Sequence, residues 1–175
     1  MATIDLHLPL DEEKVNSLHA GDSVRLYGSL YTGRDAAHKR LVELVSRGEP
    51  LPIPLQGETI YYVGPAPAKP GQAVGPAGPT SSYRMDAYTP PLLKLGLRGM
   101  IGKGLRGHDV VDAMRLYGAV YFGAVGGAAA LIARAIKESQ VVAYPDLGTE
   151  AIHRFRVEGM PVLVLIDRWG NNLYE

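Results

Sequence analysis

The feature that most constrains the fold is the alternation of short apolar segments with amphipathic ones, which is clearest in the second half of the chain. An apolar segment of strand length at 99–101 precedes helical periodicity at 109–117, and the segment 119–124 precedes 128–137 in the same way. Alternating strand and helix signals are typical of α/β proteins with partly parallel sheets. We therefore predict an α/β fold with a partly parallel sheet.

The first half of the chain supplies the same two kinds of segment. Its clearest helix begins after Thr32, which we expect to cap it, and ends at Gly48. The remaining strands are expected at 3–10, 23–31, 59–63, 141–144 and 162–167, and the remaining helices at 11–18, from Ser82, from Thr89 and at 149–155. A turn at 168–172 allows 173–175 to pair back as a last edge. Between the elements, 64–79 is a loop rich in Pro, Gly and Ala.

Length and charge exclude several classes of protein. A chain of 175 residues suffices for one domain with a hydrophobic core, so we expect a single domain over 1–175. With 18 basic and 18 acidic residues, the net charge is zero, which argues against general nucleic-acid binding. The longest uncharged apolar run, 119–133, is shorter than the ~20 residues of a membrane helix, and no secretory signal is visible. We expect a cytoplasmic protein that binds neither nucleic acid nor a membrane.

The chain contains no cysteine. It therefore forms no disulfide and cannot by itself hold a cysteine-ligated metal or iron–sulfur cluster. The five histidines are scattered, without the spacing of metal ligands. We predict no metal ligand in this chain, so any metal that its chemistry needs has ligands elsewhere.

The stretch 78–86, with the sequence GPTSSYRMD, is the strongest candidate for a binding site. It places a tight turn, three consecutive hydroxyls and Arg84 at the start of an expected helix. Amides, hydroxyls and a guanidinium that point one way bind a carboxylate or a phosphate. The segment also lies where positive charge is concentrated, because residues 60–107 contain one anion, Asp86, and six cations. These cations are Lys69, Arg84, Lys94, Arg98, Lys103 and Arg106. Local charge on a neutral chain favours a small anionic ligand, although a Pro-Gly turn, a serine cap and a surface arginine would also explain the segment.

Two further cations occupy similar loops. Arg34 lies in the first turn of a helix, where a cation opposes the helix dipole unless it shares an anion with the free amides. Lys103 lies between two glycines, which let the backbone approach a ligand closely. Two or three fixed cations suit a dicarboxylate, because each end of such a ligand needs its own partner.

The segment 102–107 has the pattern GxGxxG after an expected strand and before an expected helix. That context is typical of dinucleotide-binding folds. The acid that would bind the ribose about 20 residues further on is absent, since 119–133 contains no acid. A nucleotide-binding oxidoreductase domain therefore stays a minor alternative.

Four segments resemble one enzyme family. TGRDAAHK at 32–39, GPTSSYRMD at 78–86, MIGKG at 100–104 and DLGTEAIHRFRVEGMPVLVLID at 146–167 are similar to the β subunit of two-subunit class I fumarases and L(+)-tartrate dehydratases. The same module forms the C-terminal domain of single-chain class I fumarases. The resemblance covers nearly the whole chain in the same order, and it implies a swivelling β/β/α three-layer domain that closes over a substrate.

The resemblance also implies a division of labour. A cysteine-bearing α subunit would hold a [4Fe-4S] cluster, and αβ pairs would form a larger hetero-oligomer around a small dicarboxylate substrate. In this chain, the resemblance implies that Arg34, Arg84 and Lys103 bind the carboxylates, with Ser81 beside them where many relatives have threonine. It makes Thr80 the candidate proton-transfer group.

The function predicted from these residues is the reversible hydration of fumarate to malate, by a hydro-lyase that is active only with its α subunit. Tyr83, which replaces a small residue of some fumarases, leaves the substrate open between fumarate, tartrate and a methylated analogue. A tartrate dehydratase β subunit and a stand-alone anion-binding or regulatory module are therefore the alternatives.

Overall fold

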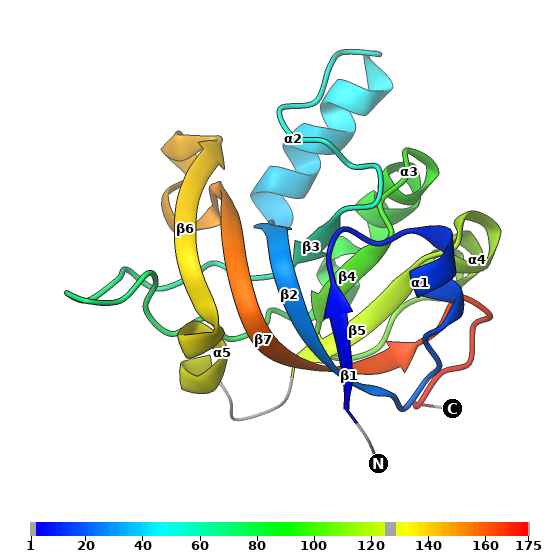
Figure 1. Cartoon of the computed structure of the whole chain (residues 1–175). Helices are drawn as coiled ribbons and strands as arrows, with labels where there is room; N and C mark the ends of the chain where they lie inside the picture. Colours follow the sequence, from blue (N-terminus) through cyan, green and yellow to red (C-terminus); the bar gives the residue numbers. More distant parts are fainter. Residues whose placement is uncertain (1–2, 125–128, 175) are drawn as a thin grey trace.

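The computed structural model describes residues 3–124 and 129–174, which form a strongly curved sheet with helices packed around it (Figure 1). The strands are β1 (Ile4–His7), β2 (Ser23–Thr32), β3 (Thr59–Tyr61), β4 (Gly99–Gly102), β5 (Val120–Ala124), β6 (Ile136–Ala143) and β7 (Ile152–Ile166). The α-helices are α1 (Glu12–Asn16), α2 (Asp35–Ser46), α3 (Thr89–Lys94), α4 (His108–Tyr117) and α5 (Ala129–Ala135), and the 3-10 helices are η1 (Ser82–Tyr88) and η2 (Pro145–Glu150).

Five strands close into a barrel. β2, β3, β4 and β5 pair in this order as parallel neighbours, and β7 pairs antiparallel with both β5 and β2, which closes the ring. β1 extends the sheet beside β2, and β6 extends it beside β7. The pairing confirms an α/β fold with a partly parallel sheet and defines it as a barrel. The description as a swivelling β/β/α domain stays a prediction.

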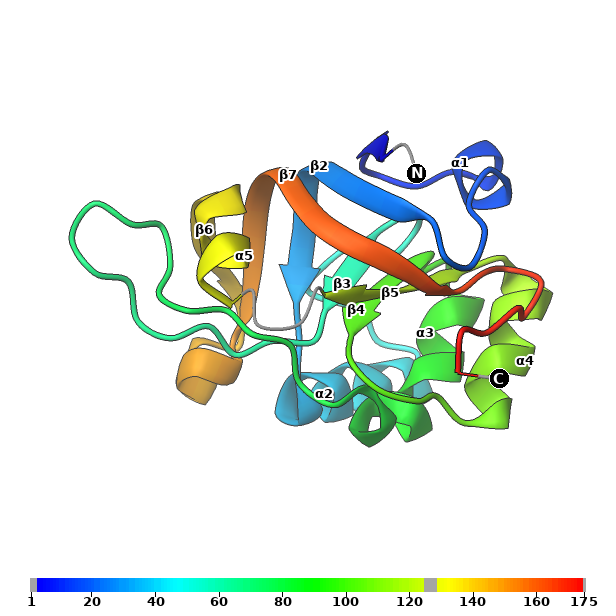
Figure 2. The ribbon, with the colours of Figure 1, turned by 90° about the horizontal axis from the view of Figure 1, so that it is seen from below.

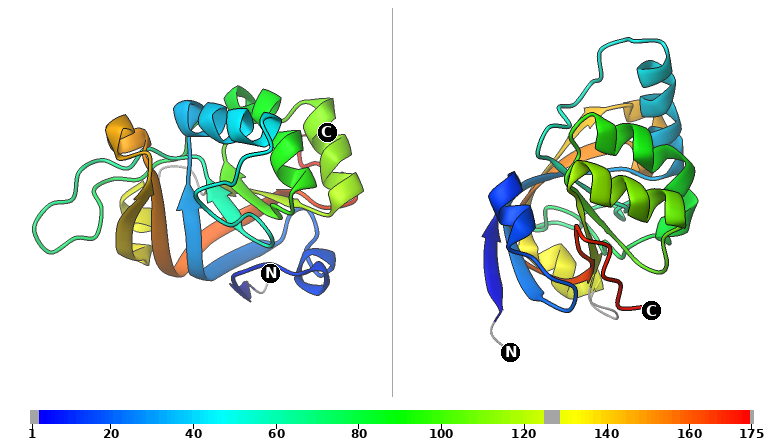
Figure 3. Two further views of the ribbon diagram at one scale, coloured as in Figure 1. Left: turned by 90° about the horizontal axis from the view of Figure 1, so that it is seen from above. Right: turned by 90° about the vertical axis from the view of Figure 1, so that its right-hand side faces the viewer.

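The parallel strands are buried on both faces. Along β3 and β4, Ile60 and Met100 pack into a cluster with α2, α3 and α4, whereas Tyr61 and Ile101 belong to a second cluster with β7 and α1. Figure 2 shows α2, α3 and α4 on one side of these strands, and Figure 3 shows β1 and α1 on the opposite side. Burial on both faces is typical of parallel strands and fixes the positions of their ends.

The expected cap of α2 is wrong. Thr32 is the last residue of β2, and its Oγ1 accepts a hydrogen bond from the backbone N–H of His153 on β7 at 2.9 Å. The N-cap is Arg34, whose side chain makes no capping hydrogen bond. Thr32 thus connects β2 to β7, and the first turn of α2 has no side-chain cap from its N-cap residue.

The expected helix at 149–155 is also wrong. Gly148, with φ +64°, kinks the short helix η2, which ends at Glu150, and Ile152 begins the long strand β7. Residues such as Phe155 pair with β2 on one side and β6 on the other, and this pairing overrides the local helical pattern. Likewise the expected helix 128–137 ends at Ala135, and β6 begins five residues before the expected strand 141–144. Residue 128 lies outside the described residues.

The other elements lie close to where the sequence places them. The segment from Ser82 is a 3-10 helix, and α3 begins at Thr89 with prolines in its first turn. The last edge is a single bridge between Ile166 and Asn172, with residue 175 outside the described residues. The loop 64–79 has no helix or strand and projects from the barrel (Figures 1 and 2). In the described part of the chain, no helix is both long and apolar enough to cross a membrane.

Candidate functional site

The candidate site lies where the segments after β3 and β4 meet. The N–H of Thr80 donates to the carbonyl of Tyr62, just beyond β3, at 2.7 Å. Ser81 forms an isolated parallel bridge with Lys103, just beyond β4, and the N–H of Ser82 donates to the carbonyl of Lys103 at 2.9 Å. The carboxyl ends of parallel strands are the usual position of ligand sites in α/β sheets. The structure therefore brings three predicted site residues, Thr80, Ser81 and Lys103, onto one backbone ladder.

The two predicted arginines meet at the start of α2. The Nε of Arg84, on η1, donates to Oδ2 of Asp35 at 3.1 Å, and Asp35 directly follows Arg34. The Nε of Arg34 and the Oδ1 of Asp35 are buried without a hydrogen-bond partner among the described residues. A buried unpaired donor is rare in native proteins, and here it provides a guanidinium with unused capacity beside the amides of a helix start. Arg84 thus lies on η1, and the other four predicted site residues lie on the segments that follow or adjoin the ends of β2, β3 and β4.

Lys103 is exposed between two glycines that serve different purposes. A Cβ on Gly102 would overlap Ser82 Oγ and the ring of Tyr62, so this position admits only a glycine without local displacement. Gly104 has φ +85°, a left-handed conformation that glycine adopts at no steric cost. The pattern GxG thus serves the close approach of β4 to η1 and the turn after Lys103.

The turn that precedes Thr80 is held by a hydrogen bond from β3. The hydroxyl of Tyr61, on β3, donates to the carbonyl of Ala77, and both residues are buried. Burial raises the pKa of Tyr61, so the phenol stays protonated and acts as a donor. The segment 78–80 is therefore held at one end by this bond and at the other by the amide of Thr80.

His38 is a functional candidate that the sequence analysis did not identify. It is buried on α2, and burial lowers its pKa to about 4, so the ring is neutral near pH 7. Its Nδ1 lies 2.8 Å from the carbonyl of Arg34. A carbonyl only accepts, so Nδ1 carries the proton and donates. The ring thereby fixes the backbone of Arg34.

The structure shows Arg106 in a different environment from the one that the sequence suggested. Counted there among the cations open to a ligand, it is buried and pairs with Asp86, the one anion of that region, at 2.8 Å. The two charges compensate each other, so the positive charge available to a ligand comes from the other cations. Only the structure shows this pairing, because the residues lie 20 positions apart.

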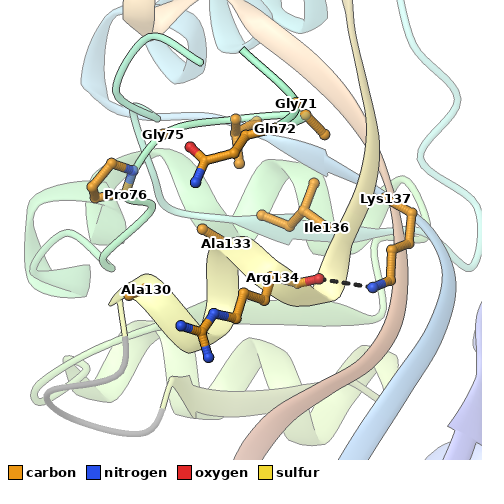
Figure 4. Close-up of a pocket in the computed structure, with 11 residues that line it drawn as sticks. Gly71, Gln72, Gly75, Pro76, Ala130, Ala133, Arg134, Ile136 and Lys137 are labelled. Carbon is orange, nitrogen blue, oxygen red and sulfur yellow. Dashed lines mark hydrogen bonds between the residues drawn. The ribbon is translucent and has the colours of Figure 1, made fainter. Parts of the chain in front are cut away.

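A pocket lies away from these residues. It has a volume of about 570 Å³ and lies between residues 71–76 of the projecting loop and the end of α5, where Lys137 donates to the carbonyl of Arg134 (Figure 4). Alanine, glycine and proline make up most of its lining, and none of the five predicted site residues contributes to it. The cavity and the candidate site are therefore separate features.

Within 3–124 and 129–174, no three His, Asp or Glu residues are grouped as metal ligands. Since the sequence also lacks cysteine, this chain cannot itself hold an iron–sulfur cluster through cysteine ligands.

Comparison with known proteins decides the family. The profile of the family described as Fumarase C-terminus matches residues 1–175. The chain belongs to this family. The resemblance seen in the four sequence segments is thereby confirmed, and the chain is homologous to class I fumarate hydratases and to a tartrate dehydratase subunit.

Two kinds of relative match the chain. "Fumarate hydratase class I, aerobic" of Salmonella typhimurium is 39% identical over 98% of this chain, and "Fumarate hydratase 2" of Leishmania major is 37% identical over 98%. The chain spans only 30% and 31% of these two proteins. The "Putative L(+)-tartrate dehydratase subunit beta" of Methanocaldococcus jannaschii is 36% identical over 95% of this chain, which spans 88% of that protein. The chain therefore spans most of the length of this tartrate dehydratase relative and about a third of the length of the fumarate hydratases.

Proposed function

We propose that this chain is the β subunit of a class I hydro-lyase that interconverts fumarate and malate. The observation that carries the proposal is the convergence of Arg34, Arg84, Lys103 and the hydroxyls of Thr80 and Ser81 at one edge of the barrel in a member of the Fumarase C-terminus family. Two arginines and a lysine give each of the two carboxylates of such a substrate at least one cationic partner. The substrate, the reaction and the partner all belong to the proposal.

Substrate binding follows from the cations. Arg34 precedes Asp35 at the start of α2 and Arg84 pairs with Asp35, so the two arginines are proposed to bind one carboxylate and Lys103 the other. The guanidinium fork suits the planar geometry of a carboxylate, whereas the ammonium of Lys103 acts as a point charge. The hydroxyl of Ser81, on the same ladder as Lys103, donates to the substrate beside it.

Thr80 is proposed to move the proton at the reacting carbon. Its backbone is fixed by the hydrogen bond to Tyr62, so its hydroxyl has a defined position at the edge of the site. Removal of a proton beside a carboxylate builds up negative charge, and fixed cations stabilise that charge in the transition state. A threonine is a weak base, so proton removal by Thr80 requires that the cations stabilise the negative charge that builds up on the substrate.

A second chain completes the proposed enzyme. Because this chain has no cysteine, a cysteine-bearing α subunit is proposed to hold a [4Fe-4S] cluster, which supplies a Lewis acid to the substrate. The relative from M. jannaschii supports such a division, since it is named as a subunit beta and this chain spans 88% of it. We further propose αβ pairs within a larger hetero-oligomer.

L(+)-tartrate dehydratase activity is the second candidate. The same relative favours it, because its length matches this chain whereas the chain spans only 30% of the fumarate hydratase from Salmonella typhimurium. Tartrate and malate are both 2-hydroxy dicarboxylates, so the three cations suit either. The stand-alone anion-binding module is the outcome that remains if no α subunit exists.

The test is anaerobic co-expression with a cysteine-bearing α chain, followed by affinity purification on this chain and an ultraviolet assay with malate and tartrate. We expect a brown complex that dehydrates one of them, and the active substrate names the enzyme. Thr80→Val is expected to lower kcat more than it raises KM, whereas the exposed Thr3→Val is the matched control with wild-type kinetics. Activity of the isolated chain, or failure of every α chain to bind it, would contradict the proposal.

A further inference from the structure

Arg106 is the one guanidinium of the described chain that the fold encloses completely among site-bearing loops. Its side chain has no exposed area. The Nε donates to Asp86 Oδ1 at 2.8 Å, and an Nη donates to Thr89 Oγ1 at 3.0 Å. The planar group lies between two rings, with its Cζ 5.2 Å from the centroid of Tyr62 and 4.9 Å from that of Tyr121. A buried charge is costly unless it is paired and hydrogen-bonded, and these contacts meet that condition.

The contacts of Arg106 connect the segments that follow β3 and β4, and these segments carry predicted site residues. Arg106 itself lies three residues after Lys103, and Asp86 lies two residues after Arg84 on η1. Tyr62 supplies the carbonyl that receives the amide of Thr80. The guanidinium, which belongs to the Lys103 loop, thus contacts both η1 and the residue just beyond β3.

Asp86 is itself fixed by a second bond. Its Oδ2 accepts from the backbone N–H of Gly107 at 2.8 Å, while Oδ1 receives Arg106. Both carboxylate oxygens therefore bind residues of the loop between β4 and α4. The carboxylate joins η1 to that loop through a side chain and through the backbone.

Tyr121 extends the same connection to the two site loops. Its hydroxyl lies 2.8 Å from the carbonyl of Gly104 and 2.7 Å from Ser82 Oγ. The carbonyl only accepts, so the phenol donates to Gly104 and receives the hydroxyl proton of Ser82. Gly104 follows Lys103 and Ser82 follows Ser81, so the stacked ring sets the spacing between a predicted cation and a predicted hydroxyl.

We propose that Arg106 is a positioning residue that holds the Lys103 loop in register with the segment Thr80–Arg84. This inference rests on the proposed function, because it concerns the geometry of that site. Arg106 is not a substrate ligand, since its side chain is enclosed by protein atoms. It acts through Asp86, Thr89 and Tyr121 on the groups that meet the substrate.

The arginine cannot be replaced by lysine without loss of this arrangement. A guanidinium stacks between two rings and donates in several fixed directions, whereas an ammonium is a point charge on a flexible stem. Arg106→Lys keeps a cation opposite Asp86 but loses the stack and the bond to Thr89. Arg115→Lys is the matched control, because Arg115 makes the same kind of ion pair with Asp112 on the exposed surface of α4.

The kinetic test uses the assembled αβ complex. We expect Arg106→Lys to form the complex and to lower kcat/KM for the dicarboxylate at least tenfold per folded molecule, with a part of the loss in kcat, while Arg115→Lys matches wild type. Thr89→Val removes one of the two hydrogen bonds that Arg106 makes to Asp86 and Thr89, and it is expected to lower kcat/KM two- to fivefold, which keeps the test valid if Arg106→Lys does not fold. Wild-type kcat and KM in folded Arg106→Lys, or in folded Thr89→Val if Arg106→Lys does not fold, would overturn the proposal.

A second measurement separates this proposal from the proposed function. In nuclear magnetic resonance spectra of the isolated chain, Arg106→Lys is expected to shift the amide signals of Ser82, Lys103 and Gly104, while signals of β6 stay in place. Unshifted site signals would overturn the positioning role. If the wild-type complex lacks hydro-lyase activity, the proposed function fails, and the amide signals alone then decide whether Arg106 holds the two loops in register.

Discussion

Arg84 is the site residue whose replacement best separates function from folding. Its side chain is 43% exposed, and its one ion pair, with Asp35, is at the surface. Arg84→Ala is expected to cost less than ~0.5 kcal/mol of unfolding free energy, as surface substitutions usually do. If Arg84 binds a substrate carboxylate, kcat/KM of the assembled enzyme falls by about 100-fold, the equivalent of a charged hydrogen bond.

The matched control for Arg84→Ala is Arg25→Ala. Arg25 pairs with Asp5 at 2.9 Å and is half exposed, but it lies on β2 beside the outer strand β1. Urea denaturation measures the stability of both variants, and steady-state kinetics measure their function. A large stability loss with normal kinetics in Arg84→Ala would make this arginine structural.

His38 predicts how stability depends on pH. Its pKa is lowered to about 4 by burial, whereas an exposed histidine titrates near ~6.5. The unfolded chain therefore binds a proton at His38 that the native chain does not, and stability falls as pH drops from about 6.5 to about 4. The loss attributable to His38 is of the order of 3 kcal/mol. Urea denaturation across this range should show a smaller loss for His38→Gln.

The comparison of the two chains isolates His38 from other groups. Burial also lowers the pKa of His153, and this histidine contributes to the pH dependence of both chains in the same direction. The difference between wild type and His38→Gln therefore reports His38 alone. Equal slopes in the two chains would show that His38 does not control the acid sensitivity.

The site was predictable where its chemistry is carried by local sequence. Arg34, Arg84 and Lys103 stand next to glycines, hydroxyls or expected helix starts, and these neighbours mark loops. Arg106 also stands next to a glycine, Gly107, but its pairing with Asp86 and its burial are not visible in the local sequence, and neither is the burial of His38. Local sequence therefore suffices to propose the ligand-facing groups, whereas the groups that hold them are seen only in the structure.

At the scale of elements, the close packing of the end of β4 against η1 requires a glycine at position 102. A Cβ on Gly102 would overlap Ser82 Oγ and the ring of Tyr62, so β4 and η1 would have to separate. Gly102→Ala is expected to destabilise the chain by about 1–3 kcal/mol, as overpacking does, and to lower activity of the assembled enzyme further than stability explains. Gly78→Ala is the control, because its Cβ would make an ordinary 3.6 Å contact with Ala129. Thermal unfolding and steady-state kinetics of the two variants test this prediction. Equal losses of stability and activity in Gly102→Ala and Gly78→Ala would contradict the packing argument.

The strand and helix order was predictable where the local pattern and the final pairing agree. β2, α2 and α4 have amphipathic or alternating sequences and lie within a few residues of their expected bounds. The helix predicted at 149–155 was wrong because residues of this segment belong to β7, which pairs with β2 on one side and β6 on the other. No local sequence signal shows that a strand has two neighbouring strands. β6 was expected to be short because it is polar along most of its length, which suits an outer strand with one partner.

At the scale of the whole molecule, closure of the barrel is the property that the local sequence cannot show. It depends on β7 reaching β5 with one end and β2 along most of its length, and the residues that pair between β7 and β2 lie more than 100 positions apart in the chain. The two hydrophobic clusters lie on opposite faces of the strands that this closure holds together. The candidate site lies at the ends of β3 and β4, two strands of the barrel that these two pairings close.

Closure predicts a hierarchy of hydrogen-exchange protection. Amides of β7 lie between β2 and either β6 or β5, so they are expected to exchange only when the whole chain unfolds. The four residues of β1 pair with β2 alone and can separate without opening the barrel. Native-state exchange in increasing urea should therefore give β7 the slope of global unfolding and β1 a smaller slope, because less surface is exposed when β1 opens. Equal slopes would mean that β1 is part of the same cooperative unit, and that the barrel alone does not define the stable core on which the site is built.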